Sequence, residues 1–444
     1  MARQAHRAGR ASRGFTLIEL MVSLVAGLIV GMAVVALAKT VTNQFYEEVR
    51  ASAAESSIRM AGDRLRADLS RAGLMSSGNL RRDPRAVKVD PADPARGHPG
   101  LQQLVGVRIE PGGSAAQATG ILFDPAFPVP PTSPAGLSPA LVPDAFSVWG
   151  NMTTGDEYFG SVDGPGGCGA NSLRIRLNQD DPSLLRITRQ PDGALNPQAS
   201  AALFRIFVPV VGSRFLVRVT DTKGFYHYAP VCGAAVDTAG TATVDIASPD
   251  SNPALLTSSN TGGVGGVDGL ETISISPLQG VRWYIARRPN ASLENAANSA
   301  LSTAKYDLFR AWIDVDGRCL INTAELVSEF AIDLKLGFTV DDPSVAEANP
   351  AKTRVIPMNA IDSDKMPWMS TAMPAPNMGR GTVGPHRIRS VRFRLSTRTA
   401  LPDRQETLTS PPGYLYRYPV GTGFARVRTV TGEVALVNQA RMNY

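Results

Sequence analysis

Histidine and cysteine are scarce in this 444-residue chain. The four histidines are His6, His98, His227 and His386, and none stands in H-E-x-x-H or another metal-ligand spacing. The three cysteines lie far apart and form no C-x-x-C pair. No G-x-S-x-G motif or nucleophile–base pairing is evident either. We therefore expect no catalytic residues, no metal site and no cofactor.

Acidic residues are absent from the first fourteen positions, which carry four arginines. Without those arginines the formal net charge falls from +6 to +2 over the remaining 430 residues. A chain so close to neutral has no general electrostatic reason to bind polyanions. We expect no nucleic-acid partner.

A second long apolar run is also lacking, so residues 15–38 stand alone. Their sequence is FTLIELMVSLVAGLIVGMAVVALA, and Glu19 is its single charge. As a helix these residues rise roughly 36 Å, enough to cross a hydrocarbon core of about 30 Å. The preceding arginines place the N-terminus in the cytoplasm and the rest of the chain outside it.

Two export signals compete for this segment. Ala36, Leu37 and Ala38 have the form of a signal-peptidase site behind a basic start. However, the apolar run is much longer than a usual signal-peptide core of about 7–15 residues. Glu19 is also costly inside a membrane, which makes it a candidate functional residue.

The run from Arg13 to Glu19, R-G-F-T-L-I-E, resembles the type IV prepilin motif. The resemblance implies that prepilin peptidase cleaves between Gly14 and Phe15 and N-methylates Phe15. It further implies that Glu19 pairs with the N-terminal amine of a neighbouring subunit in a filament. The alternative for Glu19 is that its side chain only extends to the membrane edge.

An amphipathic pattern continues beyond Lys39. Apolar residues at i, i+3 and i+4 spacing are Val41, Phe45, Val49, Ala53, Ile58, Ala61, Leu65, Leu69 and Ala72. Gly73 is a natural helix stop. The chain is thus predicted to comprise a leader (1–14), a transmembrane half-helix (15–38), an amphipathic half-helix (39–72) and a β-rich head (73–444).

Strand-like segments recur through the head. They are 173–177, 214–219, 272–276, 281–286, 309–315 and 391–399. Alternation in three of them predicts half-buried strands with arginines on the solvent face. Segments 81–145 and 341–386 are rich in proline, glycine, aspartate and alanine, and we expect long loops or insertions there.

Two late segments are similar to PilW, a family of minor pilins, and to the type II secretion pseudopilin J. Residues 325–338 resemble the family segment where a helix or turn enters a strand, and residues 388–398 resemble a late strand with the pattern V-R-x-x-L-x-x-R. The resemblance implies an α+β fold, with one long N-terminal helix laid on a β-rich head.

The resemblance also implies a function, that of a minor pilin that primes type IV pilus assembly at or near the tip and supports twitching and adhesion. Expected partners are other minor and major pilins, prepilin peptidase, the inner-membrane assembly platform, a tip adhesin, and membrane lipid before assembly. Expected locations are the inner membrane, with a periplasmic head, and then the pilus. The alternatives are a type II secretion pseudopilin or a membrane-anchored periplasmic enzyme or binding protein.

Three local patterns in the head remain open. In an oxidising compartment Cys168 and Cys232, both in turn-like glycine contexts, are the favoured disulfide pair; pairing of Cys319 or three free thiols are the alternatives. Residues 164–169 fit G-x-G-x-x-G, but a strand-like segment follows, so we expect a plain loop. Asp314, Asp316 and the later Glu325 suggest a calcium loop, although a hairpin turn is simpler.

Overall fold

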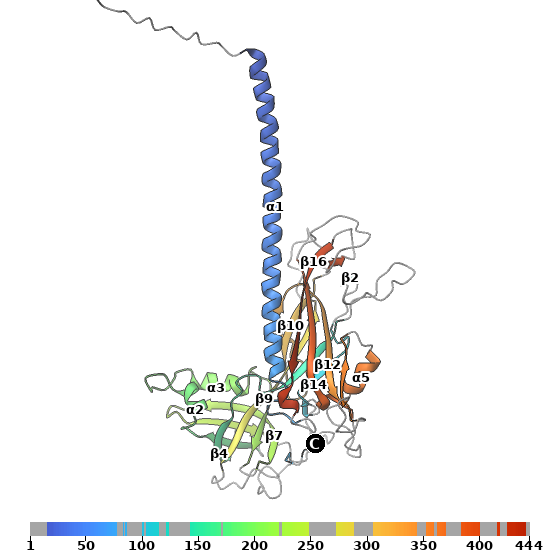
Figure 1. Ribbon diagram of the computed structural model, residues 1–444. Helices are drawn as coiled ribbons and strands as arrows, with labels where there is room; N and C mark the ends of the chain where they lie inside the picture. The colour runs from blue at the N-terminus through green and yellow to red at the C-terminus, as the bar shows by residue number, and fades with distance from the viewer. Residues whose placement is uncertain are drawn as a thin grey trace, which may run out of the picture. The chain divides into compact units, whose positions relative to one another are not determined.

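The structure, a computed structural model, describes residues 16–77, 83, 85–86, 100–101, 104–114, 121–123, 143–169, 172–221, 224–247, 272–287, 305–343, 352–358, 362–369, 383–399, 415–417 and 424–440. The chain divides into two compact units, Met1–Ala53 and Ala54–Tyr444. Helix α1 (Leu17–Ser70) contributes residues to both units (Figure 1).

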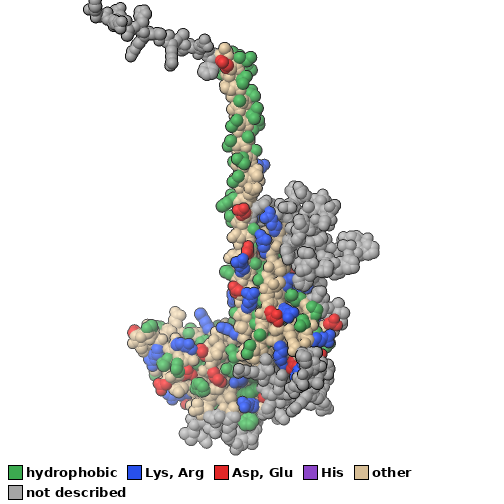
Figure 2. Space-filling model, viewed as in Figure 1, with side chains coloured by type: hydrophobic (Ala, Val, Ile, Leu, Met, Phe, Trp, Pro, Cys, Tyr) green, Lys and Arg blue, Asp and Glu red, His purple; other side chains and the backbone are tan. Residues whose placement is uncertain are grey.

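In the first unit, the part of α1 from Leu17 to Ala38 is apolar on all sides, with Glu19 as its one charged residue. Its large apolar side chains from Leu17 to Leu37 are each more than half exposed, and Figure 2 shows them around the helix. This is the single helix of the described residues long and apolar enough to cross a membrane. Isolated from lipid, such a surface would be unstable in water, so the segment is built for an apolar environment.

The second unit contains sixteen described strands and several short helices. The strands are β1 (Val107–Glu110), β2 (Ile121–Phe123), β3 (Ala145–Gly150), β4 (Tyr158–Pro165), β5 (Ser172–Leu177), β6 (Phe215–Thr220), β7 (Tyr226–Val236), β8 (Ala242–Ala247), β9 (Ile273–Ala286), β10 (Asp307–Ile313), β11 (Glu325–Ser328), β12 (Ala331–Asp341), β13 (Thr353–Ile356), β14 (Ile388–Arg398), β15 (Leu415–Arg417) and β16 (Phe424–Ala435). The short helices are α2 (Pro182–Thr188), α3 (Ala199–Phe207), α5 (Asp362–Met369), α6 (Val437–Ala440), η6 (Ile321–Thr323) and η8 (Pro385–Arg387).

Six antiparallel strands close into a barrel. Their order is β4–β5–β8–β7–β6–β9, and β9 pairs with β4 again, which closes the ring. We call β4–β8 with residues 273–278 of β9 the barrel. Side chains from every strand fill its interior, and Leu184 of α2 with Leu203 and Phe207 of α3 complete this core. A barrel this narrow is a packed core rather than a ligand cavity.

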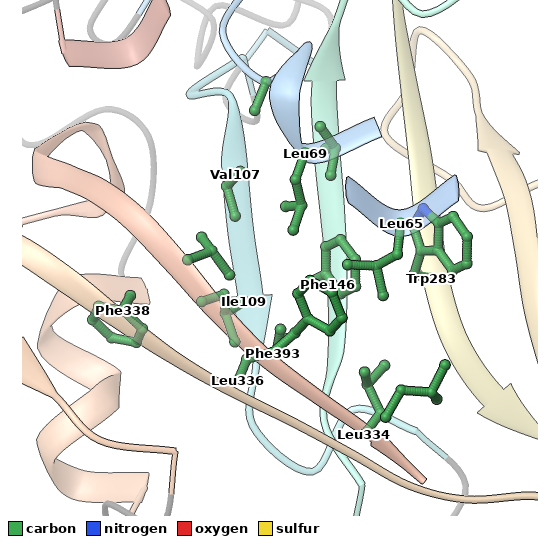
Figure 3. Packing of buried hydrophobic residues seen from close by; sticks show 14 of the residues in the cluster. Leu65, Leu69, Val107, Ile109, Phe146, Trp283, Leu334, Leu336, Phe338 and Phe393 are labelled. Atoms are coloured by element: carbon green, nitrogen blue, oxygen red, sulfur yellow. The ribbon is translucent and has the colours of Figure 1, made fainter. Parts of the chain in front are cut away.

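The remaining strands form two sheets around a second core, which we call the sandwich. One sheet contains β1, β3, residues 279–286 of β9, β10 and β11; the other has the order β13–β12–β14–β16–β15–β2. The C-terminal part of α1 supplies Ile58, Leu65 and Leu69 to this core, each at most 2% exposed. Figure 3 shows Leu65 and Leu69 facing Phe146 and Trp283 of one sheet and Phe393 of the other.

Strand β9 joins the barrel to the sandwich. Its first half pairs with β4 and β6, and its second half pairs with β3 and β10. Gly280 lies at the transition, where a Cβ atom would come within 2.6 Å of the Trp149 ring. A larger residue there would displace Trp149, so glycine lets the strand continue from one core to the other.

The α+β fold class is confirmed, with a long N-terminal apolar helix and a large β-rich head of antiparallel sheets. Residues 58–72 of the predicted apolar stripe are buried at its expected positions, whereas Val41, Phe45 and Val49 lie in the other unit and are exposed. The helix ends at Ser70, two residues before the predicted end, and turns into Gly73 with a φ of 77°.

Four expectations about the head need correction. Segments 272–276 and 281–286 form one strand, β9, rather than two. Arg394 and Arg398 of β14 are 5% and 2% exposed, so they are not on a solvent face. Residues 325–338 contain the expected turn into a strand, with Phe330 at a φ of 54° before β12, but the strand β11, which was not expected, precedes the turn. The segments expected to be loops, 81–145 and 341–386, also contain β1, β2, β13 and α5.

Candidate processing and assembly site

Gly14 and Phe15 lie outside the described residues, which begin at Thr16. Glu19 lies in the first turn of α1 and folds back on Thr16. Its Oε2 atom accepts hydrogen bonds from the Thr16 backbone N–H at 3.0 Å and from the Thr16 hydroxyl at 2.9 Å. In return, the Glu19 N–H donates to Thr16 Oγ1 at 3.3 Å. The two residues therefore form a capping box at the start of the helix.

The capping box gives Glu19 a defined position. The carboxylate satisfies a backbone N–H that the first helical turn leaves without an intrahelical partner. It also lies beside the positive end of the helix dipole, which favours a negative charge. Its remaining oxygen, Oε1, has no such contact within the described residues. One oxygen thus holds the helix start, and the capping box does not use the other.

At the other end of α1, Asp68 is buried between the helix and the first sheet. Its Oδ2 atom accepts from Arg310 Nε at 2.7 Å and from Trp283 Nε1 at 2.9 Å. Asp68 and Arg310 are 6% and 7% exposed. The ion pair fixes the helix to β9 and β10, and the added hydrogen bond offsets part of its desolvation cost. Sequence analysis missed Asp68, although it is the one acid next to the apolar stripe at Leu65 and Leu69.

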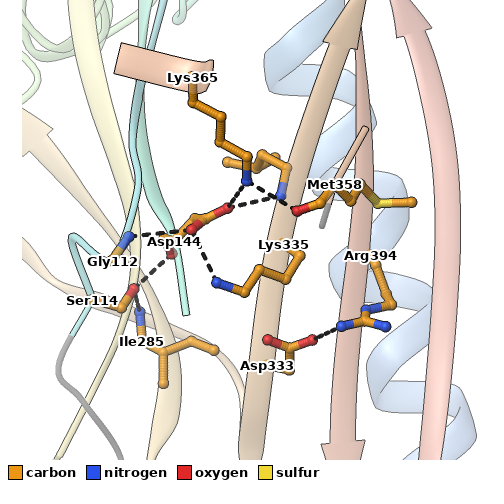
Figure 4. A network of polar contacts seen from close by, with 10 residues as sticks. Gly112, Ser114, Asp144, Ile285, Asp333, Lys335, Met358, Lys365 and Arg394 are labelled. Atoms are coloured by element: carbon orange, nitrogen blue, oxygen red, sulfur yellow. Dashed lines mark hydrogen bonds and ion pairs between the residues drawn. The ribbon is translucent and has the colours of Figure 1, made fainter. Parts of the chain in front are cut away.

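A second buried cluster surrounds Asp144, directly before β3. The Asp144 carboxylate accepts from Lys335 Nζ and Lys365 Nζ, each at 3.3 Å, and from the backbone N–H groups of Gly112 and Leu336. Figure 4 shows both lysines converging on Asp144 from β12 and α5. The sequence offers no signal for this cluster, because Lys365 is 221 positions away from Asp144.

Asp333 lies near that cluster, on β12. Its Oδ2 atom accepts from Arg394 NH2 at 2.6 Å, and both side chains are almost fully buried. Burial raises the pKa of the Asp333 carboxyl, and the charge of Asp144 adds to the rise, whereas Arg394 and Lys335 oppose it. The buried Arg394, expected at the surface, is therefore the partner of a buried carboxyl.

The structure joins Cys168 and Cys232, the pair favoured from the sequence, in a disulfide with Cα atoms 6.0 Å apart. Cys319 is free, and burial raises the pKa of its thiol. Gly164 lies in β4, and Gly166, Gly167 and Gly169 belong to the hairpin connection between β4 and β5, which the disulfide fixes to β7. That connection does not open a helix, so it lacks the context of a nucleotide-binding loop.

The calcium candidates do not converge. The Asp314 carboxylate accepts the backbone N–H groups of Asp316 and Arg318, as in a tight turn. Glu325 instead forms a two-bond ion pair with Arg64 of α1, at 2.5 and 2.6 Å. Over the described part of the chain no group of three or more metal-binding side chains is found.

Comparison with known families matches residues 9–35 to the prokaryotic N-terminal methylation motif. The matched span includes Gly14, Phe15 and Glu19 and most of the apolar segment. The searches of curated proteins and of solved structures found no significant match. The motif and the long apolar helix together support a type IV pilin-like or pseudopilin-like protein. The motif implies interaction with other pilus components and processing by prepilin peptidase.

Proposed function

We propose that this protein is a minor pilin of a type IV pilus, of the PilW kind, which helps to prime pilus assembly at or near the tip. The observation that carries the proposal is the methylation motif at residues 9–35, which extends into the exposed apolar part of α1 and is followed by a β-rich head. Twitching motility and adhesion are then the cellular processes that it supports. Its role is structural rather than enzymatic.

The proposed order of events starts in the inner membrane. Residues 1–14 are a leader that prepilin peptidase removes, and Phe15 becomes the N-methylated first residue. Residues 15–38 anchor the chain, residues 39–72 continue the helix, and residues 73–444 lie in the periplasm. The assembly platform then transfers the subunit into a filament with other minor and major pilins and, at the tip, an adhesin.

Glu19 is the proposed assembly residue. Its carboxylate is held by Thr16 on one oxygen, which leaves the other oxygen to receive the amine of a neighbour. In an apolar filament core such an ion pair would set the axial register of the subunits, because a displaced pair leaves two buried charges without partners.

The size of the head supports a low copy number. Residues 73–444 number 372, which implies a compact radius of gyration of about 21 Å. Packed helices lie only about 8–10 Å apart, so heads of this size would crowd one another along a filament made of this chain alone. A terminal position, where one side is open, removes that constraint.

Processing is tested by mass spectrometry of the N-terminal peptide. We expect a start at Phe15 with one methyl group, whereas a start at Lys39 would exclude a pilin. Glu19→Ala should leave membrane insertion intact and reduce incorporation into filaments, with Glu48→Ala on the same helix as the matched control. Normal levels of the Glu19→Ala protein in sheared pili would favour a side chain that only extends to the membrane edge.

Copy number is tested by quantitative proteomics of sheared pili. We expect this chain at a small fraction of the major pilin, and its deletion should reduce the number of pili without changing their diameter. An abundance equal to that of the major pilin would contradict a minor pilin. Recovery with a secretion pseudopilus instead of pili would identify the pseudopilin alternative, which shares the same N-terminal motif.

A further inference from the structure

The buried contact between Lys365 and Asp144 brings together the two groups that form an amide, an amine and a carboxyl. The Lys365 Nζ atom lies 3.3 Å from Asp144 Oδ2, and the Asp144 Cγ atom is one bond beyond that oxygen. The side chains are 2% and 0% exposed. Trp368 and Met369 of α5 belong to the same apolar core, so bulk water is excluded from this side of the contact.

The surroundings of Asp144 hold its two oxygens in place. Gly112 N–H donates to Oδ1 at 3.2 Å, and Leu336 N–H donates to Oδ2 at 3.0 Å. Backbone donors aimed at both oxygens would stabilise the negative charge that develops when an amine adds to a carboxyl carbon. Lys335 Nζ lies 3.3 Å from Oδ1, whereas Lys365 contacts the other carboxylate oxygen, Oδ2. Figure 4 shows this arrangement.

We propose that Lys365 and Asp144 condense into an intramolecular amide, which cross-links α5 to the residue before β3. One ammonium proton first passes to the Asp144 carboxylate. The Nζ lone pair that this frees forms a bond to Cγ, and one Cγ–O bond breaks. The departing oxygen leaves as water with two of the three ammonium protons, and the third stays on the amide nitrogen. One positive and one negative charge vanish together, so the reaction needs neither an external proton nor an oxidant.

Burial supplies the driving force. An ion pair in an apolar core carries a desolvation penalty for both charges, and a neutral amide of the same atoms does not. The released water leaves a site where it would be poorly solvated.

The intact mass of the full chain, purified in detergent, tests the cross-link directly. We expect the protein to be lighter, by the mass of one water molecule, than its processed and disulfide-bonded sequence. Trypsin does not cleave after an acylated lysine, so the peptide that contains Lys365 should remain joined to the peptide that contains Asp144. With the disulfide reduced, the closed loop should still make the denatured chain migrate faster on a gel.

Two charge-conserving variants separate the cross-link from other dehydrations. Lys365→Arg keeps a cation at the site but has no nucleophilic amine, so this variant should have the mass of its own sequence without the loss of water. Lys305→Arg is the matched control, because Lys305 is a buried lysine outside the site that pairs with Glu329 at 3.2 Å, and this variant should keep the mass loss. An unmodified wild-type mass with normal cleavage after Lys365 would show a plain ion pair and overturn the proposal. A mass loss that persists in Lys365→Arg would place the dehydration elsewhere and overturn it too.

Discussion

The barrel and the sandwich solve the problem of burying a sheet in different ways. The barrel closes on itself, and the buried residues of its core all lie between positions 158 and 275, with Trp312 and Leu320 packed against them and no part of α1. The sandwich leaves its sheets open, and its core combines residues from Ile58 on α1 to Leu436 near the C-terminus. The buried core of the barrel thus comes from one continuous segment, whereas that of the sandwich needs both ends of the chain.

The barrel and the sandwich also differ in where their ion pairs lie. Among the described residues, the buried carboxylates of the sandwich that have cationic partners include Asp68, Asp144 and Asp333, which contact Arg310 of β10, Lys365 of α5 and Arg394 of β14. The barrel places its corresponding pair, Arg174 and Asp245, on the outer surface and adds a disulfide. An open sandwich assembled from distant segments therefore depends on specific polar contacts, and a closed barrel depends on its ring of strands.

The largest expected effect is on the sandwich, from Asp68→Ala. The substitution leaves Arg310 buried without its carboxylate, and breaking a buried pair in this way costs about 3–5 kcal/mol. We expect hydrogen exchange of the full chain to accelerate in β10 and β14 and to stay unchanged in β5 and β8.

The matched control for that variant is Asp63→Ala. Asp63 is on the same helix and pairs with Arg66, but its side chain is 74% exposed. Its loss should change the free energy of unfolding by less than about 1 kcal/mol. Equal acceleration in the barrel and the sandwich after Asp68→Ala would mean that the two unfold as one unit.

The next effect is on the barrel, from the double variant Cys168→Ser with Cys232→Ser. The disulfide closes a loop with a sequence separation of 64, and its removal should lower the free energy of unfolding by up to about 4 kcal/mol. Hydrogen exchange should accelerate in β4, β5 and β7, while the sandwich keeps its protection. Cys319→Ser is the control, since Cys319 is outside the bridge. Loss of protection confined to the sandwich would contradict the independence of the two cores.

The barrel and the sandwich also differ in how far the sequence predicts them. Alternating residues indicate β5, β6 and β14, and one apolar stripe indicates the buried face of α1, because these signals are local. Closure of the barrel is not local, since it requires both edges of β9 to find partners. Pro277 and Gly280 within β9 suggest a break between two strands, yet pairing on both sides holds the strand together. Strands of three or four residues, such as β1 and β13, are too short to show a period.

The candidate site residues also differ in how far the sequence predicts them. Glu19 stands out because a carboxylate in an apolar run is conspicuous, and Cys168 and Cys232 stand out because cysteine is rare. Asp68 and Asp144 look like ordinary surface acids in the sequence. Their importance comes from partners more than 100 positions away, at Arg310 and Lys365, which only the folded chain brings to them.

The smallest expected effect is a difference in pH dependence between the barrel and the sandwich. The Arg174 guanidinium lowers the pKa of Asp245, and the Gly167 N–H assists. A lowered pKa means that Asp245 stabilises the barrel above its unfolded value of about 3.9 and that this stabilisation is lost as the pH falls. Because the pair is partly exposed, its contribution should be about 1 kcal/mol or less.

Asp333 should act in the opposite direction. Its raised pKa means that the folded sandwich binds the proton more tightly than the unfolded chain does. The resulting stabilisation is present below about pH 3.9 and is lost as the pH rises through the folded pKa. Hydrogen exchange at a series of pH values should show Asp245→Asn removing the acid sensitivity of the barrel, while Asp333→Asn removes a loss of sandwich stability at higher pH. A change in the pH dependence of the same core by both variants, or of both cores in the same direction, would contradict the prediction that the barrel and the sandwich respond to pH independently.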